Sequence, residues 1–212
     1  MPDRKAADLA DLAVELERTT EIDDQTEQML EIAAIVEEAL APIGLHPIIV
    51  GGLAVAYWTS SAHLTSDIDV VMPDVAEADA RLEQLGFARE GRFWILPGRD
   101  VFLEAPGSRL EPSAEGFETI ETRSGRFVRI HSADELLLQR LMEFAGTGSS
   151  SSFQQCLWLL GSEGIDQERL DRRAQVEGLS TALAALRSTV ESFERTGQLP
   201  ASWELKDLAR RL

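Results

Sequence analysis

Apolar residues recur three and four positions apart near the start of the chain, and this spacing predicts helices there. Two apolar stripes are separated by a polar stretch at residues 21–24, so we expect two amphipathic helices with a break between them. The stripes consist of Leu9, Leu12 and Leu16, and then of Met29, Ile32, Ile35, Val36 and Leu40.

The middle of the chain carries short apolar runs bounded by glycine, proline and polar residues, which is typical of strands. A run that starts after Pro47 ends at Gly51 and Gly52, and a second run opens with Asp67. The pattern predicts helices at 53–60 and 74–85, the second capped by Asp74, and a strand pair or bent strand at 87–96. A further strand is expected at 100–106, and a hairpin at 117–122 and 126–130.

Helical spacing returns after residue 132 and continues to the end of the chain. Ser132 and Glu135 match a capping box at the start of the first of these helices. The glycine and serine run at 146–152 predicts a flexible loop. Helices are expected at 133–144, 153–160, 166–175, 180–195 and 203–211. The pattern therefore predicts an α+β (α/β) protein with an acidic helical extension (1–45), a strand-containing domain (46–145) and a C-terminal helical lobe (146–212).

Candidate chemistry gathers between residues 48 and 72. Glycine lets a phosphate approach main-chain N–H groups at the start of a helix, so Gly51 and Gly52 are candidate phosphate contacts. Side chains alternate along a strand, so Asp67 and Asp69 share one face. Two carboxylates on one face repel unless a cation lies between them, and Mg²⁺ prefers such oxygen ligands. This stretch therefore predicts a phosphate-binding turn beside a metal site.

Gly51 and Gly52, a helix, and then Asp67-Ile68-Asp69-Val70 resemble the signature of the nucleotidyltransferase superfamily, which has the polymerase-β-like fold. Small prokaryotic members of this superfamily include AbiEii-type toxins and minimal nucleotidyltransferases. The resemblance implies a small mixed sheet flanked by helices. It also implies a third acid on a neighbouring strand, which we assign to Glu104 with Asp100 as the alternative.

The resemblance also implies a role for each site residue. Asp67, Asp69 and Glu104 would be the catalytic residues and the ligands of two Mg²⁺ ions, for which Mn²⁺ could substitute. Thr65 and Ser66 would either contact the nucleotide phosphates or only cap a turn. His63 stands where related sequences often have arginine, and an imidazole binds phosphate less strongly than a guanidinium.

Composition adds that the chain is strongly acidic, with 37 acidic residues, 20 basic residues and a formal charge of −17 over 212 residues. This excess predicts a high-salt (halophilic) cytoplasm and argues against unaided binding of DNA or RNA at low salt. The chain has no apolar run of 18 residues, and its N-terminus lacks the basic and then apolar segments of a signal peptide. We therefore expect a cytoplasmic protein with no membrane contact. Arg123, Arg126 and Arg129 are interpreted as paired surface charge on the hairpin.

Two functional hypotheses follow. The first is an Mg²⁺-dependent, nucleotide-binding enzyme that moves a nucleoside monophosphate from ATP or another NTP to an acceptor hydroxyl. One form of this hypothesis makes the enzyme the toxin of a toxin–antitoxin system. Its acceptor would be a tRNA, a protein or a small molecule. The alternative is a catalytically silent antitoxin or scaffold with the same fold, which would bind its cognate partner through residues 1–45.

Overall fold

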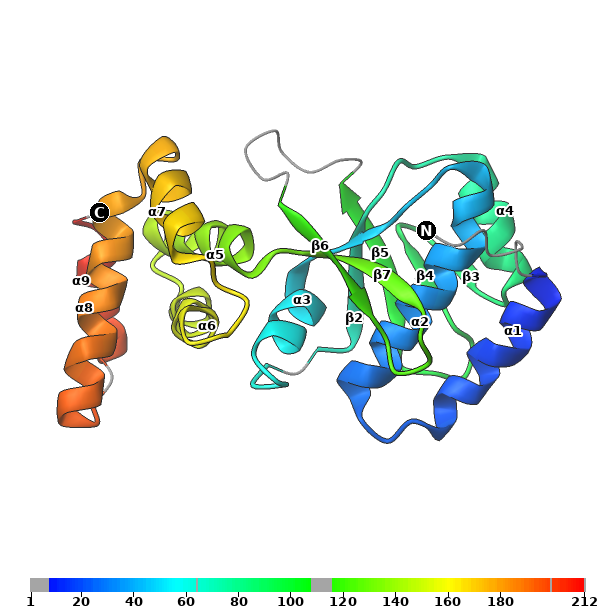
Figure 1. Cartoon of the computed structure of the whole chain (residues 1–212), viewed down its shortest axis with the longest axis horizontal. Helices are drawn as coiled ribbons and strands as arrows, with labels where there is room; N and C mark the ends of the chain where they lie inside the picture. Colours follow the sequence, from blue (N-terminus) through cyan, green and yellow to red (C-terminus); the bar gives the residue numbers. More distant parts are fainter. Residues whose placement is uncertain (1–7, 64, 108–115, 199, 212) are drawn as a thin grey trace. The chain divides into compact units, whose positions relative to one another are not determined.

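The computed structural model describes residues 8–63, 65–107, 116–198 and 200–211. Within these ranges the strands form one mixed sheet of seven strands in the order β3-β4-β5-β2-β1-β7-β6 (Figure 1). The pairs β2–β5 and β1–β7 are parallel, and the other neighbours are antiparallel. The strands are β1 (Ile48–Ile49), β2 (Asp67–Val71), β3 (Ala88–Glu90), β4 (Phe93–Ile95), β5 (Phe102–Gly107), β6 (Phe117–Glu121) and β7 (Phe127–His131).

Helices pack on one face of the sheet. On β2 the apolar residues Ile68 and Val70 are buried while their neighbours are partly exposed, and the same alternation continues on β5 with Leu103 and on β7 with Ile130. Helix α2 (Gln25–Leu40) packs against β7, and α1 (Leu9–Arg18) and α4 (Ala76–Gln84) pack against α2 (Figure 1). The core therefore lies between these helices and the apolar face of the sheet.

Helix α1 is held at its C-terminal end by Arg99, which lies in the connection between β4 and β5. The guanidinium of Arg99 donates to the Leu16 carbonyl and to the Thr19 hydroxyl, each at 2.9 Å, and to the Glu17 carboxylate at 3.0 Å. A guanidinium on the last carbonyls of a helix satisfies acceptors that have no partner within the helix. Arg99 therefore links the C-terminal end of α1 to the β4–β5 connection of the sheet.

The helices after residue 132 form a second compact unit. The first unit comprises the described residues of 1–57 and 64–131, and the second those of 58–63 and 132–212. Phe144 and Phe153 stack with ring centroids 4.7 Å apart in the core of the second unit. Its helices are α5 (Ala133–Thr147), α6 (Ser150–Leu160), α7 (Gln167–Val176), α8 (Ser180–Thr196) and α9 (Ser202–Ala209). The predicted division at residues 45 and 145 stays a prediction, and residues 1–7 of its first segment lie outside the described residues.

The predicted α+β class is confirmed, but three local predictions are wrong. Residues 146–152 are mostly helical, because Ser149 caps α6 and its hydroxyl accepts a hydrogen bond from the Ser152 N–H. Asp74 does not cap α4, whose N-cap is Val75 without a side-chain hydrogen bond. The third error concerns the start of α5.

No capping box forms at the start of α5, since the Ser132 side chain makes no capping hydrogen bond. Glu135 instead pairs with Arg173 of α7, whose Nη2 donates to Oε2 at 3.1 Å. The neighbouring Asp134 is fully buried and pairs with Arg169 of the same helix. Burial raises the pKa of Glu135, and the Arg173 guanidinium opposes that rise. The ion pair with Arg173 of another helix therefore replaces the capping interaction that Glu135 would make in a capping box.

Among the described residues, no helix combines the length and the apolar character that crossing a membrane requires.

Candidate functional site

The two glycines begin helix α3 (Gly51–Trp58), directly after β1. Gly51 has φ +64°, a left-handed conformation that side-chain-bearing residues rarely adopt. A Cβ built on Gly51 would lie 2.1 Å from Asp69 Oδ2 and 3.0 Å from Asp69 Cβ. The Asp69 carboxylate therefore lies directly against the first turn of α3, where the helix dipole favours negative charge.

Asp67 and Asp69 lie on β2, with Ile68 between them buried on the covered face. The expected alternation thus places both carboxylates on the other, more open face. Thr65 and Ser66 hold the start of this strand. The Thr65 hydroxyl accepts a 3.3 Å hydrogen bond from the Asp67 N–H, and the Ser66 hydroxyl lies 3.4 Å from Asp67 Oδ1. In this structure both residues position Asp67.

Glu104 lies on β5, which is the parallel neighbour of β2. The register pairs Asp69 with Glu104 and Asp67 with Phe102, and directly paired residues project from the same face. Adjacent strands are about 4.8 Å apart, so the three acidic residues lie on one patch of the sheet. Asp100 is exposed and precedes the first residue of β5 by two positions. The strand register therefore favours Glu104 over Asp100 as the third acid.

The side chain of Glu104 points to an arginine. Arg92 Nε lies 3.1 Å from Glu104 Oε1, and the Glu104 side chain is only 13% exposed. In the part of the chain that the structure describes, no three acidic, histidine or cysteine side chains are grouped as a metal site. The oxygen donors and their strand register suit a divalent cation, although Arg92 already engages one of the two Glu104 oxygens.

His63 belongs to the second unit, where its ring lies 6.4 Å from the ring of Trp158. Burial lowers the pKa of His63, and the charge of Arg140 lowers it further. Both effects favour the neutral imidazole, so His63 is a weaker source of positive charge than an arginine at this position would be.

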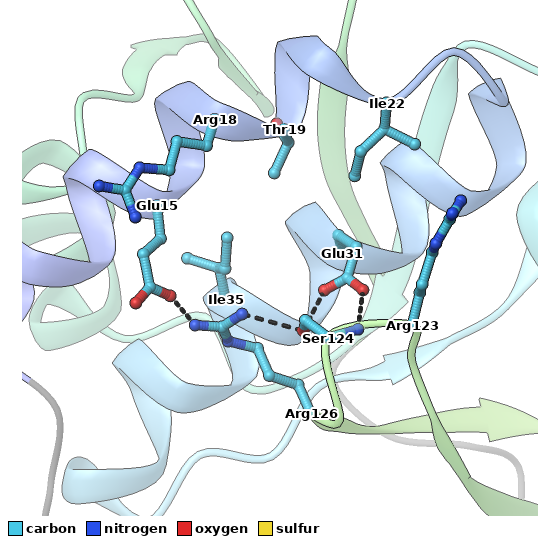
Figure 2. Close-up of a pocket in the computed structure, with 9 residues that line it drawn as sticks. All are labelled: Glu15, Arg18, Thr19, Ile22, Glu31, Ile35, Arg123, Ser124 and Arg126. Atoms are coloured by element: carbon cyan, nitrogen blue, oxygen red, sulfur yellow. Dashed lines mark hydrogen bonds and ion pairs between the residues drawn. The ribbon is translucent and has the colours of Figure 1, made fainter.

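A cavity of about 450 Å³ opens elsewhere in the sheet unit, between α1, α2 and the β6–β7 hairpin (Figure 2). The Glu31 carboxylate enters it and accepts hydrogen bonds from the Ser124 N–H and hydroxyl, each at 2.7 Å (Figure 2). Two of the three hairpin arginines are paired, as expected: Arg123 with Glu27 at 3.0 Å and Arg126 with Glu38 at 3.2 Å. The guanidinium carbon of the third, Arg129, lies 5.6 Å from the centre of the Phe117 ring. None of the predicted site residues lines this cavity, which is lined by Glu15, Arg18, Thr19, Ile22, Glu31, Ile35, Arg123, Ser124 and Arg126.

Sequence reasoning missed Arg92. It stands in the turn between β3 and β4, and the register of β4 places Phe93 beside Glu104. The Arg92 guanidinium carbon also lies 4.9 Å from the centre of the Phe93 ring. The sequence around Gly91 and Arg92 gives no local sign that the arginine belongs to the site, because it is the pairing of β4 with β5 that brings Arg92 to Glu104.

Comparison with known proteins supports the fold. No protein-family model and no curated protein matches the chain. The chain is similar to an antigenic nucleotidyltransferase-like protein from Paracoccidioides brasiliensis, with a TM-score of 0.54 and 17% identity over 85% of this chain and 96% of that chain. The solution structure of the antibiotic-resistance factor ANT(2″)-Ia gives a TM-score of 0.46 and 16% identity over 81% of this chain and 99% of that one. The chain has a nucleotidyltransferase-like fold.

Proposed function

We propose that this chain is a nucleotidyltransferase that moves a nucleoside monophosphate from an NTP to an acceptor hydroxyl. One observation carries the proposal: the parallel register of β2 and β5 aligns Asp69 with Glu104, beside Asp67 and against the glycine turn of α3. Three acids on one face of the sheet, beside a helix N-terminus, would combine a metal platform with a phosphate site.

In this proposal Asp67, Asp69 and Glu104 are the ligands of two Mg²⁺ ions, which Mn²⁺ can replace. When bound, these ions supply positive charge that stabilises the attacking and leaving oxygens at the α-phosphorus. The acceptor oxygen forms a bond to the α-phosphorus, the bond from that phosphorus to the oxygen bridging to the β-phosphorus breaks, and pyrophosphate leaves. Glu104 accepts the proton of the acceptor hydroxyl. The N–H groups at Gly51 and Gly52 receive the β- and γ-phosphates, with Ser66 beside them.

The decisive test is transfer of label from α-labelled NTPs, supplied one at a time with Mg²⁺ or Mn²⁺ and a cell extract. The acidic composition makes high salt the first condition to test, with low salt in parallel. The Asp67→Asn, Asp69→Asn double variant should reduce labelling to the level without enzyme while its circular dichroism stays unchanged. Asp100→Asn removes the alternative third acid and should label normally, because the strand register aligns Glu104 and not Asp100 with Asp69. Equal labelling by the double variant and the wild type would refute the proposal.

The same experiment identifies the acceptor. Label in tRNA or in a protein, together with growth arrest on expression, would support the proposal of a toxin in a toxin–antitoxin pair. Label in a small molecule would instead support a modifying enzyme, which we expect to leave growth unaffected.

A second candidate is a catalytically silent scaffold or antitoxin with the same fold. The pairing of Glu104 with Arg92 favours it, because that arginine satisfies an acid that a metal would otherwise need. Calorimetry separates the two candidates. Mg²⁺-dependent binding of an NTP supports the enzyme, whereas capture of a partner through residues 1–45 without any NTP binding supports the scaffold.

A further inference from the structure

The ion pair between Arg92 and Glu104 joins an exposed guanidinium to a largely buried carboxylate. The Arg92 side chain is 73% exposed, whereas the Glu104 side chain is 13% exposed. Arg92 stands in a turn next to Gly91, which has φ +63° and open space around it. Its guanidinium contacts the Glu104 carboxylate and the face of the Phe93 ring. Water can therefore solvate the guanidinium when it leaves, whereas the largely buried Glu104 carboxylate needs another cation in its place.

Glu104 is the acid of the patch whose carboxylate already has a cationic partner. Its backbone is in register with Asp69, so metal binding at the patch requires an exchange of that partner and no change of strand pairing. A guanidinium at 3.1 Å occupies one carboxylate oxygen and repels an incoming dication.

We propose that Arg92 is a counter-ion that exchanges partners when the substrate binds. Without a metal it neutralises Glu104 beside the two aspartates. When the metal–triphosphate complex arrives, Glu104 turns to the metal and the guanidinium transfers to the triphosphate oxygens. Five N–H donors in a planar fork suit phosphate oxygens as well as they suit a carboxylate. This inference rests on the proposed function and adds a phosphate-binding residue to it.

The first test is Mn²⁺ binding without nucleotide, followed by the electron paramagnetic resonance signal of free Mn²⁺. We expect Arg92→Ala to bind Mn²⁺ about fivefold more tightly than wild type, the effect of removing one weak ion pair. The gain should vanish when Arg92→Ala is combined with Glu104→Gln. Arg123→Ala, which removes an equally exposed arginine paired with Glu27, is the matched control for net charge and should leave Mn²⁺ affinity unchanged.

The second test is binding of the non-transferable analogue α,β-methylene-ATP at saturating Mn²⁺, measured by calorimetry. Arg92→Ala should weaken this binding about tenfold, as expected for the loss of a charge-assisted contact, and Arg92→Lys should weaken it less. Unchanged or weaker Mn²⁺ binding by Arg92→Ala, or unchanged analogue binding, would each overturn the proposal. Because the Mn²⁺ titration needs no turnover, a protein that transfers no nucleotide would still answer the first question.

Discussion

The contact between Gly51 and Asp69 makes Gly51→Ala the most informative single substitution in this chain. The new methyl group would meet two difficulties at once. The backbone has φ +64°, where a residue with a Cβ is strained, and the Cβ would lie 2.1 Å from Asp69 Oδ2. Because Asp69 Cβ is itself 3.0 Å away, rotation of the carboxylate alone does not clear the space.

The two costs can be separated with a matched control. Gly44 also lies in the left-handed region, with φ +75°, and nothing lies within 4 Å of its hypothetical Cβ. Gly44→Ala should therefore lower the free energy of unfolding by the backbone strain alone, about 1–2 kcal/mol. Gly51→Ala should lower it by a similar backbone strain and by about 1–3 kcal/mol more for crowding β2.

Differential scanning calorimetry measures both variants. A loss of 1 kcal/mol lowers the melting temperature of a chain of this size by about 2–4 °C, so the crowding cost should separate the two variants clearly. Adding Asp69→Ala to Gly51→Ala should recover part of the loss, as a coupling of about 0.5–3 kcal/mol in the double-mutant cycle. The reasoning is refuted if Gly51→Ala and Gly44→Ala have the same melting temperature and if adding Asp69→Ala to Gly51→Ala restores no stability. The Asp69 carboxylate would then not lie against the glycine turn.

Three further predictions concern groups outside the acidic patch. Glu31→Ala should cost about 1–3 kcal/mol in urea unfolding, because the buried Glu31 carboxylate accepts two hydrogen bonds from Ser124, and hydrogen bonds to charged groups contribute about that much. Glu27→Ala, which removes an exposed ion pair, should cost less than about 1 kcal/mol, and equal effects would contradict the reasoning. Arg169→Ala should cost about 3–5 kcal/mol in the same assay, because Asp134 is left buried and charged, and a loss below 1 kcal/mol would contradict it. Burial raises the pKa of Cys156 to about 12, so a thiol reagent at pH 8 should label it only in urea, and rapid labelling of the native protein would show an accessible thiol.

Much of the fold follows from local pattern. Helical spacing predicts α2 and alternation predicts β2, because each depends on which face of one element is buried. The same alternation puts Asp67 and Asp69 on one face without knowledge of any other strand. Where a motif depends on a partner, local reasoning fails. Ser132 and Glu135 have capping-box spacing, but Arg173 on a helix much later in the chain pairs with Glu135 instead.

The sequence by itself determined the elements, the glycine turn and the shared face of the two aspartates, because these depend on the backbone preferences and side-chain directions of neighbouring residues. Only the tertiary structure decided that β5 pairs with β2 in the register that aligns Glu104 with Asp69, and that the Asp69 carboxylate lies against Gly51. It also decided that Arg92 holds Glu104. Strand order and register are chosen by how whole apolar faces are buried together, and no single segment carries that information.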